Sequence, residues 1–284
     1  MKYAVIDIGS NSVRLMMSNG KETLYKNINT TRLAEGMGEE KILTPVAIKR
    51  TAEAVSFFYA KAKNENADKI YVFATAAVRQ AKNKEAFIFA VKELCGVKVD
   101  VVSGEEEAEL GYTGAIDGLD GGVIDIGGAS SEIIVVQDGK KIYSKSLDIG
   151  AVKIKDKCGQ DLLMVEQFIL SKIVEYGQVP NTTYYTIGGT ATSIASLVLE
   201  LEVYNPSLID GFVLDIKTLK NLVEKLFSLT VEQRKLLKGM YPPRAEVIAG
   251  GAKLLLEIML KLKIDKVIVS ERDNLEGYLI KRLG

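Results

Sequence analysis

The chain has 284 residues, of which 47% are hydrophobic and 26% are charged, and Lys plus Arg equal Asp plus Glu at 37 each. This composition is typical of a soluble globular protein with two domains of ordinary size, and the neutral balance excludes a basic field for nucleic acid over the whole surface. The chain has no histidine, which excludes Ser-His-Asp hydrolases, phosphohistidine enzymes and histidine-ligated metal centres.

The two cysteines, Cys95 and Cys158, lack the spacing of metal ligands and do not indicate a disulfide framework. Met1 and Lys2 lead straight into a short apolar run, and the sequence shows no signal peptide or long apolar span. We therefore expect a cytoplasmic protein with no membrane partner and no nucleic-acid partner.

The first predicted elements are two strands between Lys2 and Met17, joined by a turn with an acid, a glycine and small polar side chains. The turn reads Asp7-Ile8-Gly9-Ser10-Asn11-Ser12-Val13-Arg14. Glycine and serine leave backbone N–H groups uncovered, so an anion such as phosphate can approach them closely. Asp7 would repel a phosphate unless a divalent cation lay between them, so the turn predicts Mg²⁺ or a bound water near this acid.

The next elements alternate between strand and helix and predict a mixed sheet flanked by helices. They are a strand near 23–29, a helix from Thr44-Pro45 through Ala62, a strand at 69–75, a helix at about 84–94 and a strand at 97–102. Arg79 follows the buried strand at the sheet edge where α/β proteins bind ligands, so we expect it to contact a phosphate. A lone arginine is more commonly a solvated surface residue.

The helix that begins at Ser103 carries three consecutive glutamates. Ser103 and Glu106 match the capping-box pattern, and acids are favoured in the first turn of a helix, which accounts for Glu105 and Glu106. Glu107 lies past the capping positions, although a solvated helix face would tolerate it. If this helix end borders a cleft, Glu107 can take a proton from an attacking water.

The glycines between 118 and 122 separate the first half from a second half that begins in the same way. Asp125, 118 positions after Asp7, opens the stretch Asp125-Ile126-Gly127-Gly128-Ala129-Ser130-Ser131-Glu132. One Asp-x-Gly turn is ordinary turn chemistry, but two copies at matched spacing favour a pair of facing turns that hold one phosphoryl group. We therefore expect metal contacts at both Asp7 and Asp125.

A third glycine turn follows a predicted strand at 183–187. Gly188-Gly189-Thr190 opens a helix there, and this strand-turn-helix context is typical of anion binding. The remainder is mostly helical, with helices at about 216–229, 244–262 and 274–283 and a strand at 266–270. We expect domains at 1–118 and 119–271, with the C-terminal helix at about 272–284 packing back on the first domain.

In this order, six blocks of the sequence resemble the exopolyphosphatase / guanosine pentaphosphate phosphatase family of the actin-like ATPase superfamily. They are Asp7-Ile8-Gly9-Ser10-Asn11-Ser12, Ala74-Thr75-Ala76-Ala77-Val78-Arg79, Ser103-Gly104-Glu105-Glu106-Glu107-Ala108, Asp125-Ile126-Gly127-Gly128-Ala129-Ser130-Ser131-Glu132, Ile187-Gly188-Gly189-Thr190 and Pro243-Arg244-Ala245-Glu246-Val247-Ile248. The blocks cover nearly the whole chain. We expect the short form of the family, without the extra C-terminal helical region of longer members.

The resemblance implies two ribonuclease-H-like domains with an active site in the cleft between them. It also implies Mg²⁺-dependent (or Mn²⁺-dependent) hydrolysis of the terminal phosphoanhydride of inorganic polyphosphate or of guanosine pentaphosphate. In this family the catalytic glutamate falls on Glu107, the phosphate-binding arginine on Arg79, and metal-associated acids on Asp125 and Glu132. Its phosphate turns fall on Gly9, Ser10, Asn11, Ser12, Gly127, Gly128, Ala129 and Ser130.

Departures from the family pattern and other readings stay open. Ala129 and Ser131 replace a glycine and a threonine, and Glu246 replaces an aspartate; Ala129 is tolerable if its φ is negative.

The basic residues Arg14, Arg32, Lys153 and Arg244 are candidates for lining a polyanion path, or are ordinary solvated side chains. A phosphotransferase of the same superfamily and a non-catalytic nucleotide or alarmone sensor are the alternatives. The sequence ranks neither the two substrates nor monomer against homodimer.

Overall fold

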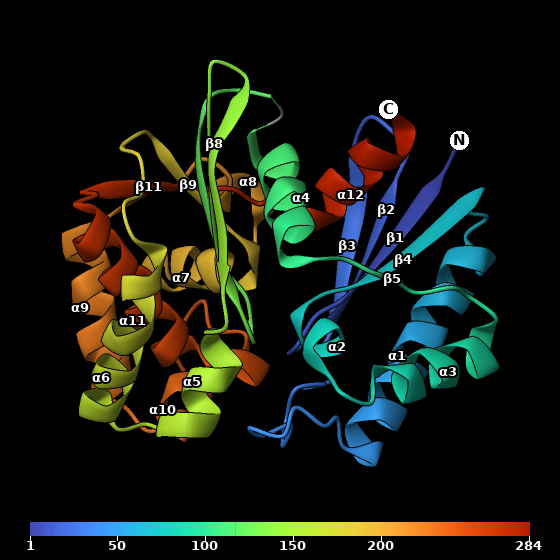
Figure 1. Ribbon diagram of the computed structural model, residues 1–284, viewed down its shortest axis with the longest axis horizontal. Helices are drawn as coiled ribbons and strands as arrows, with labels where there is room; N and C mark the ends of the chain where they lie inside the picture. The colour runs from blue at the N-terminus through green and yellow to red at the C-terminus, as the bar shows by residue number, and fades with distance from the viewer. Residues whose placement is uncertain (117) are drawn as a thin grey trace.

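The computed structural model describes residues 1–116 and 118–284 and contains two mixed β-sheets, each with helices packed against it. Figure 1 shows the two sheets on opposite sides of the molecule, with α4 and α12 between them. Each half begins with a hairpin and follows it with parallel strands, as the acid-glycine repeat predicts. The expected α/β fold of two mixed sheets is confirmed.

The first sheet has the strand order β3-β2-β1-β4-β5. Its strands are β1 (Tyr3–Ile8), β2 (Val13–Ser18), β3 (Thr23–Asn29), β4 (Lys69–Ala74) and β5 (Asp100–Val101). Alternate residues of β1 face different layers: Ile6 and Ile8 pack with the helices on one face, and Val5 packs with α12 on the other. Because both faces are covered, β1 is apolar along almost its whole length.

Three helices belong to this half: α1 (Pro45–Asn64), α2 (Ala76–Gln80) and α3 (Lys84–Cys95). The hydroxyl of Thr44 accepts a hydrogen bond from the Ala47 N–H, which fixes the start of α1 as its Thr-Pro sequence predicts. Gly96 has a φ of +68° and ends α3 in the left-handed conformation that glycine favours.

The second sheet has the order β10-β11-β9-β6-β7-β8. Its strands are β6 (Gly121–Ile126), β7 (Ser131–Gln137), β8 (Lys140–Leu147), β9 (Tyr184–Ile187), β10 (Val213–Asp215) and β11 (Lys266–Val269). Its helices are α5 (Ala151–Cys158), α6 (Leu162–Ile173), α7 (Gly188–Val198), α8 (Pro206–Ile209), α9 (Ile216–Ser228), α10 (Val231–Lys235) and α11 (Ile248–Leu262). Ile124 and Ile126 of β6 join the apolar core that these helices form.

Two helices lie between the sheets: α4 (Gly104–Ile116) and α12 (Asn274–Leu283). Leu110 of α4 packs with the first sheet, whereas Ala108 and Ile116 of the same helix pack against Val123 of the second. The helix that carries Glu107 is therefore held by both halves. The C-terminal helix α12 packs on β1 and on α4.

Two predicted elements differ in detail from the structure, and two observed elements were not predicted. The strand expected at 97–102 is only Asp100–Val101, and β10 and α8 were not expected. The helix expected at 244–262 is interrupted: a 3-10 turn covers Pro242–Arg244, and α11 begins at Ile248. The interruption matters because it brings Arg244 into the cleft.

Candidate active site

The two acid-glycine turns have the same local geometry. In the first, the Gly9 N–H donates to the Ser12 carbonyl at 3.0 Å; in the second, the Gly127 N–H donates to the Ser130 carbonyl at 3.0 Å. Both follow a strand that ends one residue after the acid, β1 after Asp7 and β6 after Asp125. The repeat in sequence is thus a repeat in structure.

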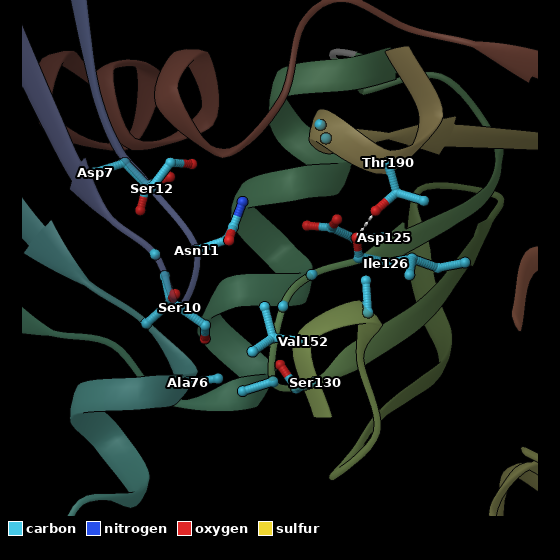
Figure 2. Close-up of a pocket in the computed structure, with 18 of the residues that line it drawn as sticks. Asp7, Ser10, Asn11, Ser12, Ala76, Asp125, Ile126, Ser130, Val152 and Thr190 are labelled. Carbon is cyan, nitrogen blue, oxygen red and sulfur yellow. Dashed lines mark hydrogen bonds between the residues drawn. The ribbon is translucent and has the colours of Figure 1, made fainter. Parts of the chain in front are cut away.

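These turns face each other across a cleft. A Cβ added at Gly128 would lie 2.8 Å from the Ser10 Cβ and 3.4 Å from the Asn11 nitrogen, so only glycine lets the two loops approach this closely. Figure 2 shows Ser10 and Asn11 on one side of the pocket and Asp125 and Ser130 on the other. Ala129 is absent from the positive-φ positions of the described chain, so the methyl group that departs from the family pattern fits this turn.

A small cavity of about 80 Å³ lies between the turns and receives nearly all of the predicted site residues. Those that line it are Asp7, Gly9, Ser10, Asn11, Ser12, Arg14, Glu107, Asp125, Gly127, Gly128, Ala129, Ser130, Gly188, Gly189 and Thr190. Arg79 and Glu132 do not line it. Arg244 and Asn274 also line the cavity.

Glu107 lies at the start of α4, with its side chain 7% exposed, and forms an ion pair with Arg79. Arg79 Nη1 donates to Glu107 Oε2 at 2.7 Å and to the Val102 carbonyl at 3.0 Å. Burial raises the pKa of Glu107, and the positive charge of Arg79 opposes that rise. Arg79 does not line the cavity and instead binds Glu107, which does, so the direct phosphate contact expected for Arg79 stays a prediction.

Asp125 is buried opposite Glu107, and burial raises its pKa to about 8, with the nearby Glu107 charge adding to the effect. Asn274 Nδ2 donates to Asp125 Oδ2 at 3.2 Å. Gly188 has a φ of +76°, and a Cβ there would lie 2.7 Å from Asp125 Oδ1. The third glycine turn therefore closes over the acid of the second.

Asp7 shares one oxygen with Arg14, whose Nε and Nη2 both donate to Asp7 Oδ2. Its other oxygen, Oδ1, is buried and has no hydrogen-bond partner in residues 1–116 and 118–284. Arg14 also forms an ion pair with Asp273, at the start of α12. Arg14 thus lines the cavity, as expected, but its charge is already balanced by two carboxylates.

Glu132 lies behind the second turn rather than in the cavity. Ser146 Oγ donates to Glu132 Oε1 at 2.7 Å, whereas Oε2 is buried and has no hydrogen-bond partner in the part of the chain that the structure describes. Burial raises the pKa of Glu132 well above its ordinary value. Within residues 1–116 and 118–284, no three Asp, Glu, Cys or His side chains converge as ligands of one ion, so the predicted set of Asp7, Asp125 and Glu132 is not assembled as a protein-only metal site.

The side chains that do face the cavity fit a metal bound together with substrate. Mg²⁺ is commonly held by one or two carboxylates, the remaining positions going to water and phosphate oxygens. Asp7 Oδ1 has no hydrogen-bond partner among the described residues, and the pKa of Asp125 is raised because burial and the nearby Glu107 charge outweigh the opposing charge of Arg14. The nearby Asn11 Nδ2 is a buried donor that also lacks a partner.

Arg244 is the cation that the sequence ranked among the weaker candidates. A Cβ at Gly189 would overlap the Arg244 guanidinium, with only 1.8 Å to Nη2, so this glycine makes room for the arginine. No hydrogen bond or ion pair with another described residue neutralises the side chain, and burial lowers its pKa to about 10. Arg244 therefore presents an unpaired positive charge to the cavity at neutral pH.

The sequence analysis missed Asp273 and Asn274. The stretch Asp273-Asn274-Leu275-Glu276 has the same capping-box spacing as Ser103 to Glu106. This pattern predicts where a helix begins but not which segments pack against it. The place of Asn274 in the cavity wall, and that of Asp273 beside Arg14, depend on how α12 folds back between the two sheets.

A sequence profile of the Ppx/GppA phosphatase family matches residues 12–284. The chain belongs to the Ppx/GppA phosphatase family. It is 28% identical to Exopolyphosphatase 2 of Mycobacterium tuberculosis, over 100% of this chain and 99% of that protein. The chain is also 27% identical to a guanosine-5'-triphosphate,3'-diphosphate pyrophosphatase of Photobacterium profundum, covering 99% of this chain but 59% of that longer protein.

The crystal structure of the Ppx/GppA family member from Aquifex aeolicus superposes with a TM-score of 0.81 at 27% identity, covering 100% of this chain and 97% of that one. The fold of this Ppx/GppA protein is therefore the two-domain actin-like fold expected from the motifs. Family membership makes it a phosphatase-type hydrolase. In the part of the chain that the structure describes, no helix is both long enough and apolar enough to cross a bilayer.

Proposed function

We propose that this Ppx/GppA protein is an exopolyphosphatase, which hydrolyses the terminal phosphoanhydride of inorganic polyphosphate and releases phosphate in the cytoplasm. Guanosine pentaphosphate, converted to the tetraphosphate, is the second substrate we propose. The observation that carries this proposal is the meeting of two phosphate-type turns and one buried glutamate in a single small cavity. A cavity of this size suits the terminal phosphate group of a chain, whose remainder would extend outside it.

Binding of the terminal phosphate falls to backbone groups. The turns at Gly9–Ser12 and Gly127–Ser130 present N–H groups and hydroxyls from two sides, so negative charge on the equatorial oxygens meets donors that are already in place. Such preorganised donors stabilise a phosphoryl-transfer transition state without reorganisation at the moment of reaction. Arg244 adds a full positive charge at the edge of the same cavity.

Glu107 is the proposed general base. Burial raises the pKa of Glu107, which makes its carboxylate a stronger base toward water. Arg79 keeps the carboxylate from losing its charge altogether and holds its Oε2 in place. An in-line attack by the water that Glu107 deprotonates then displaces the rest of the chain as the leaving group.

A divalent cation, Mg²⁺ or Mn²⁺, would be held by Asp125 and Asp7, the two aspartates that line the cavity. When bound, it supplies charge neutralisation for the phosphate oxygens.

The experiment that tests this proposal is a phosphate-release assay on polyphosphates of defined length, beside guanosine pentaphosphate and ATP, with and without Mg²⁺. The proposal predicts Mg²⁺-dependent release of free phosphate from polyphosphate. Transfer of labelled phosphate to an added nucleotide would indicate a phosphotransferase instead. Ligand binding without any release would indicate a sensor and reject hydrolysis.

A further inference from the structure

The first turn of α12 touches both halves of the site. Asp273, which is 4% exposed, accepts a hydrogen bond from Arg14 of β2 in the first sheet. Its neighbour Asn274, also 4% exposed, donates to Asp125 of β6 in the second sheet at 3.2 Å. Asn274 thus binds Asp125 of the second turn directly, and its neighbour Asp273 binds Asp7 of the first turn through Arg14.

This helix end is fixed by its own capping box. Asp273 Oδ1 accepts from the Leu275 N–H at 3.0 Å, and Glu276 Oε2 accepts from the Asp273 N–H at 3.0 Å. Glu276 is held in turn by Lys26 of β3, whose Nζ lies 2.9 Å from Oε1. Asp273 therefore caps α12 with its Oδ1 and accepts from Arg14 with its Oδ2.

Glycines place this turn directly on α4. A Cβ at Gly114 would lie 1.9 Å from the Asp273 carbonyl oxygen, and one at Gly277 would lie 1.9 Å from the Leu110 carbonyl oxygen. A Cβ at Gly111 would lie 2.9 Å from Asn274 Oδ1. The two helices touch backbone to backbone, so the helix that carries Glu107 also sets the position of Asp273 and Asn274.

We propose that Asp273 and Asn274 are positioning residues, Asn274 orienting the Asp125 carboxylate and Asp273 holding Arg14 against Asp7. This inference rests on the proposed function, because the acids it positions are those proposed to meet metal and phosphate. The physical need is clear: Asp125 is buried near the negative charge of Glu107, which favours turning its carboxylate away, and the Asn274 amide opposes that turn with a neutral donor. Asn274 lines the cavity, and its amide oxygen is buried against Gly111 of α4 with no hydrogen-bond partner among the described residues.

The test compares Asn274→Ala with Asn221→Ala, which removes an exposed asparagine from α9. Mn²⁺ affinity is measured by electron paramagnetic resonance without substrate, and it is expected to weaken about 10- to 100-fold in the first variant only, as for other residues that orient a metal ligand. Turnover of tripolyphosphate should fall more than its KM changes. Asn274→Ser, which keeps a shorter donor, should recover part of the loss.

A second pair isolates the charge of Asp273. Asp273→Asn keeps a good capping residue but weakens the hold on Arg14. Asp161→Asn makes the same change at the cap of α6, where Asp161 accepts from the Met164 N–H at 2.9 Å and does not line the cavity. Asp273→Asn should lower turnover, whereas Asp161→Asn should leave it unchanged.

A crystal structure of Asn274→Ala without metal gives a readout independent of activity. It is expected to show the Asp125 carboxylate turned from its present position. An unmoved carboxylate together with unchanged Mn²⁺ affinity would overturn the inference. A wild-type chain that releases no phosphate would reject the proposed function, and the position of Asp125 in the variant would still decide the role of Asn274.

Discussion

Arg79 and Glu107 form a buried ion pair with 2.7 Å between Nη1 and Oε2, and Glu107 is the member that faces the cavity. Arg79 comes from α2 after β4, and Glu107 from the first turn of α4 after β5. Two neighbouring parallel strands thus deliver the pair to one edge of the first sheet, opposite the second turn. Arg79 therefore holds the carboxylate of Glu107 in place, and Glu107 in turn faces the cavity.

Replacement of the proposed base should stop chemistry and spare binding. Glu107→Gln keeps the shape of the side chain but cannot accept a proton, so turnover should fall by about 10²- to 10⁴-fold. Tripolyphosphate binding, measured by calorimetry, should remain because the turns are intact. Glu105→Gln is the matched control: its side chain is in the same helical turn, 65% exposed and paired with Lys141. Near-normal turnover in Glu107→Gln would reject Glu107 as the base.

Removal of Arg79 should move the acid limb of the pH–rate profile to higher pH. Burial raises the pKa of Glu107 and Arg79 lowers it, so Arg79→Met leaves the raising effect unopposed. A base works only when deprotonated, and a higher pKa means that more alkaline solution is needed to deprotonate it. The dependence of kcat/KM on pH measures the shift. Arg282→Met, which removes a pair with Asp100 away from the cavity, should leave the limb in place; a shift of equal size there would contradict the assignment.

The third glycine turn can be tested with two alanines that carry the same backbone strain. Gly188 and Gly211 have φ values of +76° and +78°, so either substitution should destabilise the fold by about 1–2 kcal/mol. Only at Gly188 does the added Cβ meet Asp125, at 2.7 Å; at Gly211 it meets nothing within 4 Å. Gly188→Ala should therefore lose activity on the order of 100-fold, whereas Gly211→Ala should lose stability alone. Denaturant unfolding and turnover, measured side by side, separate the two effects, and equal activity losses would show that strain is the cause.

Local signals predicted most of the fold because they act within a few residues. Apolar runs ended by an acid and a glycine gave both hairpins, Thr44-Pro45 gave the start of α1, and Gly96 gave the end of α3. The short β5 and the break before Ile248 were missed, since pairing length and interruption depend on neighbours that the local pattern does not specify.

The site was predictable where it repeats and unpredictable where it depends on packing. The repeated acid-glycine pattern predicts both turns. Glu107 is predicted because helix capping accounts for Glu105 and Glu106 but not for Glu107. Asn274 reaches Asp125 only because Gly111, Gly114 and Gly277 let α12 touch α4, a contact between segments far apart in the sequence. For the same reason, the sequence placed Arg79 at the correct sheet edge but did not show that Glu107 is its partner.

Arg244 should matter more for polyphosphate binding than the other basic residues near the cleft. Arg14 is held by Asp7 and Asp273, Arg32 lies 3.5 Å from Glu246, and Lys153 pairs with Asp148. Arg244 has no such partner among the residues that the structure describes, so a phosphate can take its full charge without displacing a carboxylate.

Arg244→Met should therefore weaken binding of a long polyphosphate by roughly tenfold or more, the effect of losing one charge-assisted hydrogen bond. The slope of log affinity against log salt should become shallower by about one unit, because one fewer phosphate is neutralised. Arg32→Met removes the same charge from an existing ion pair and should change neither quantity by a comparable amount. Equal losses in the two variants would mean that general surface charge, and not the unpaired guanidinium beside Gly189, attracts the chain.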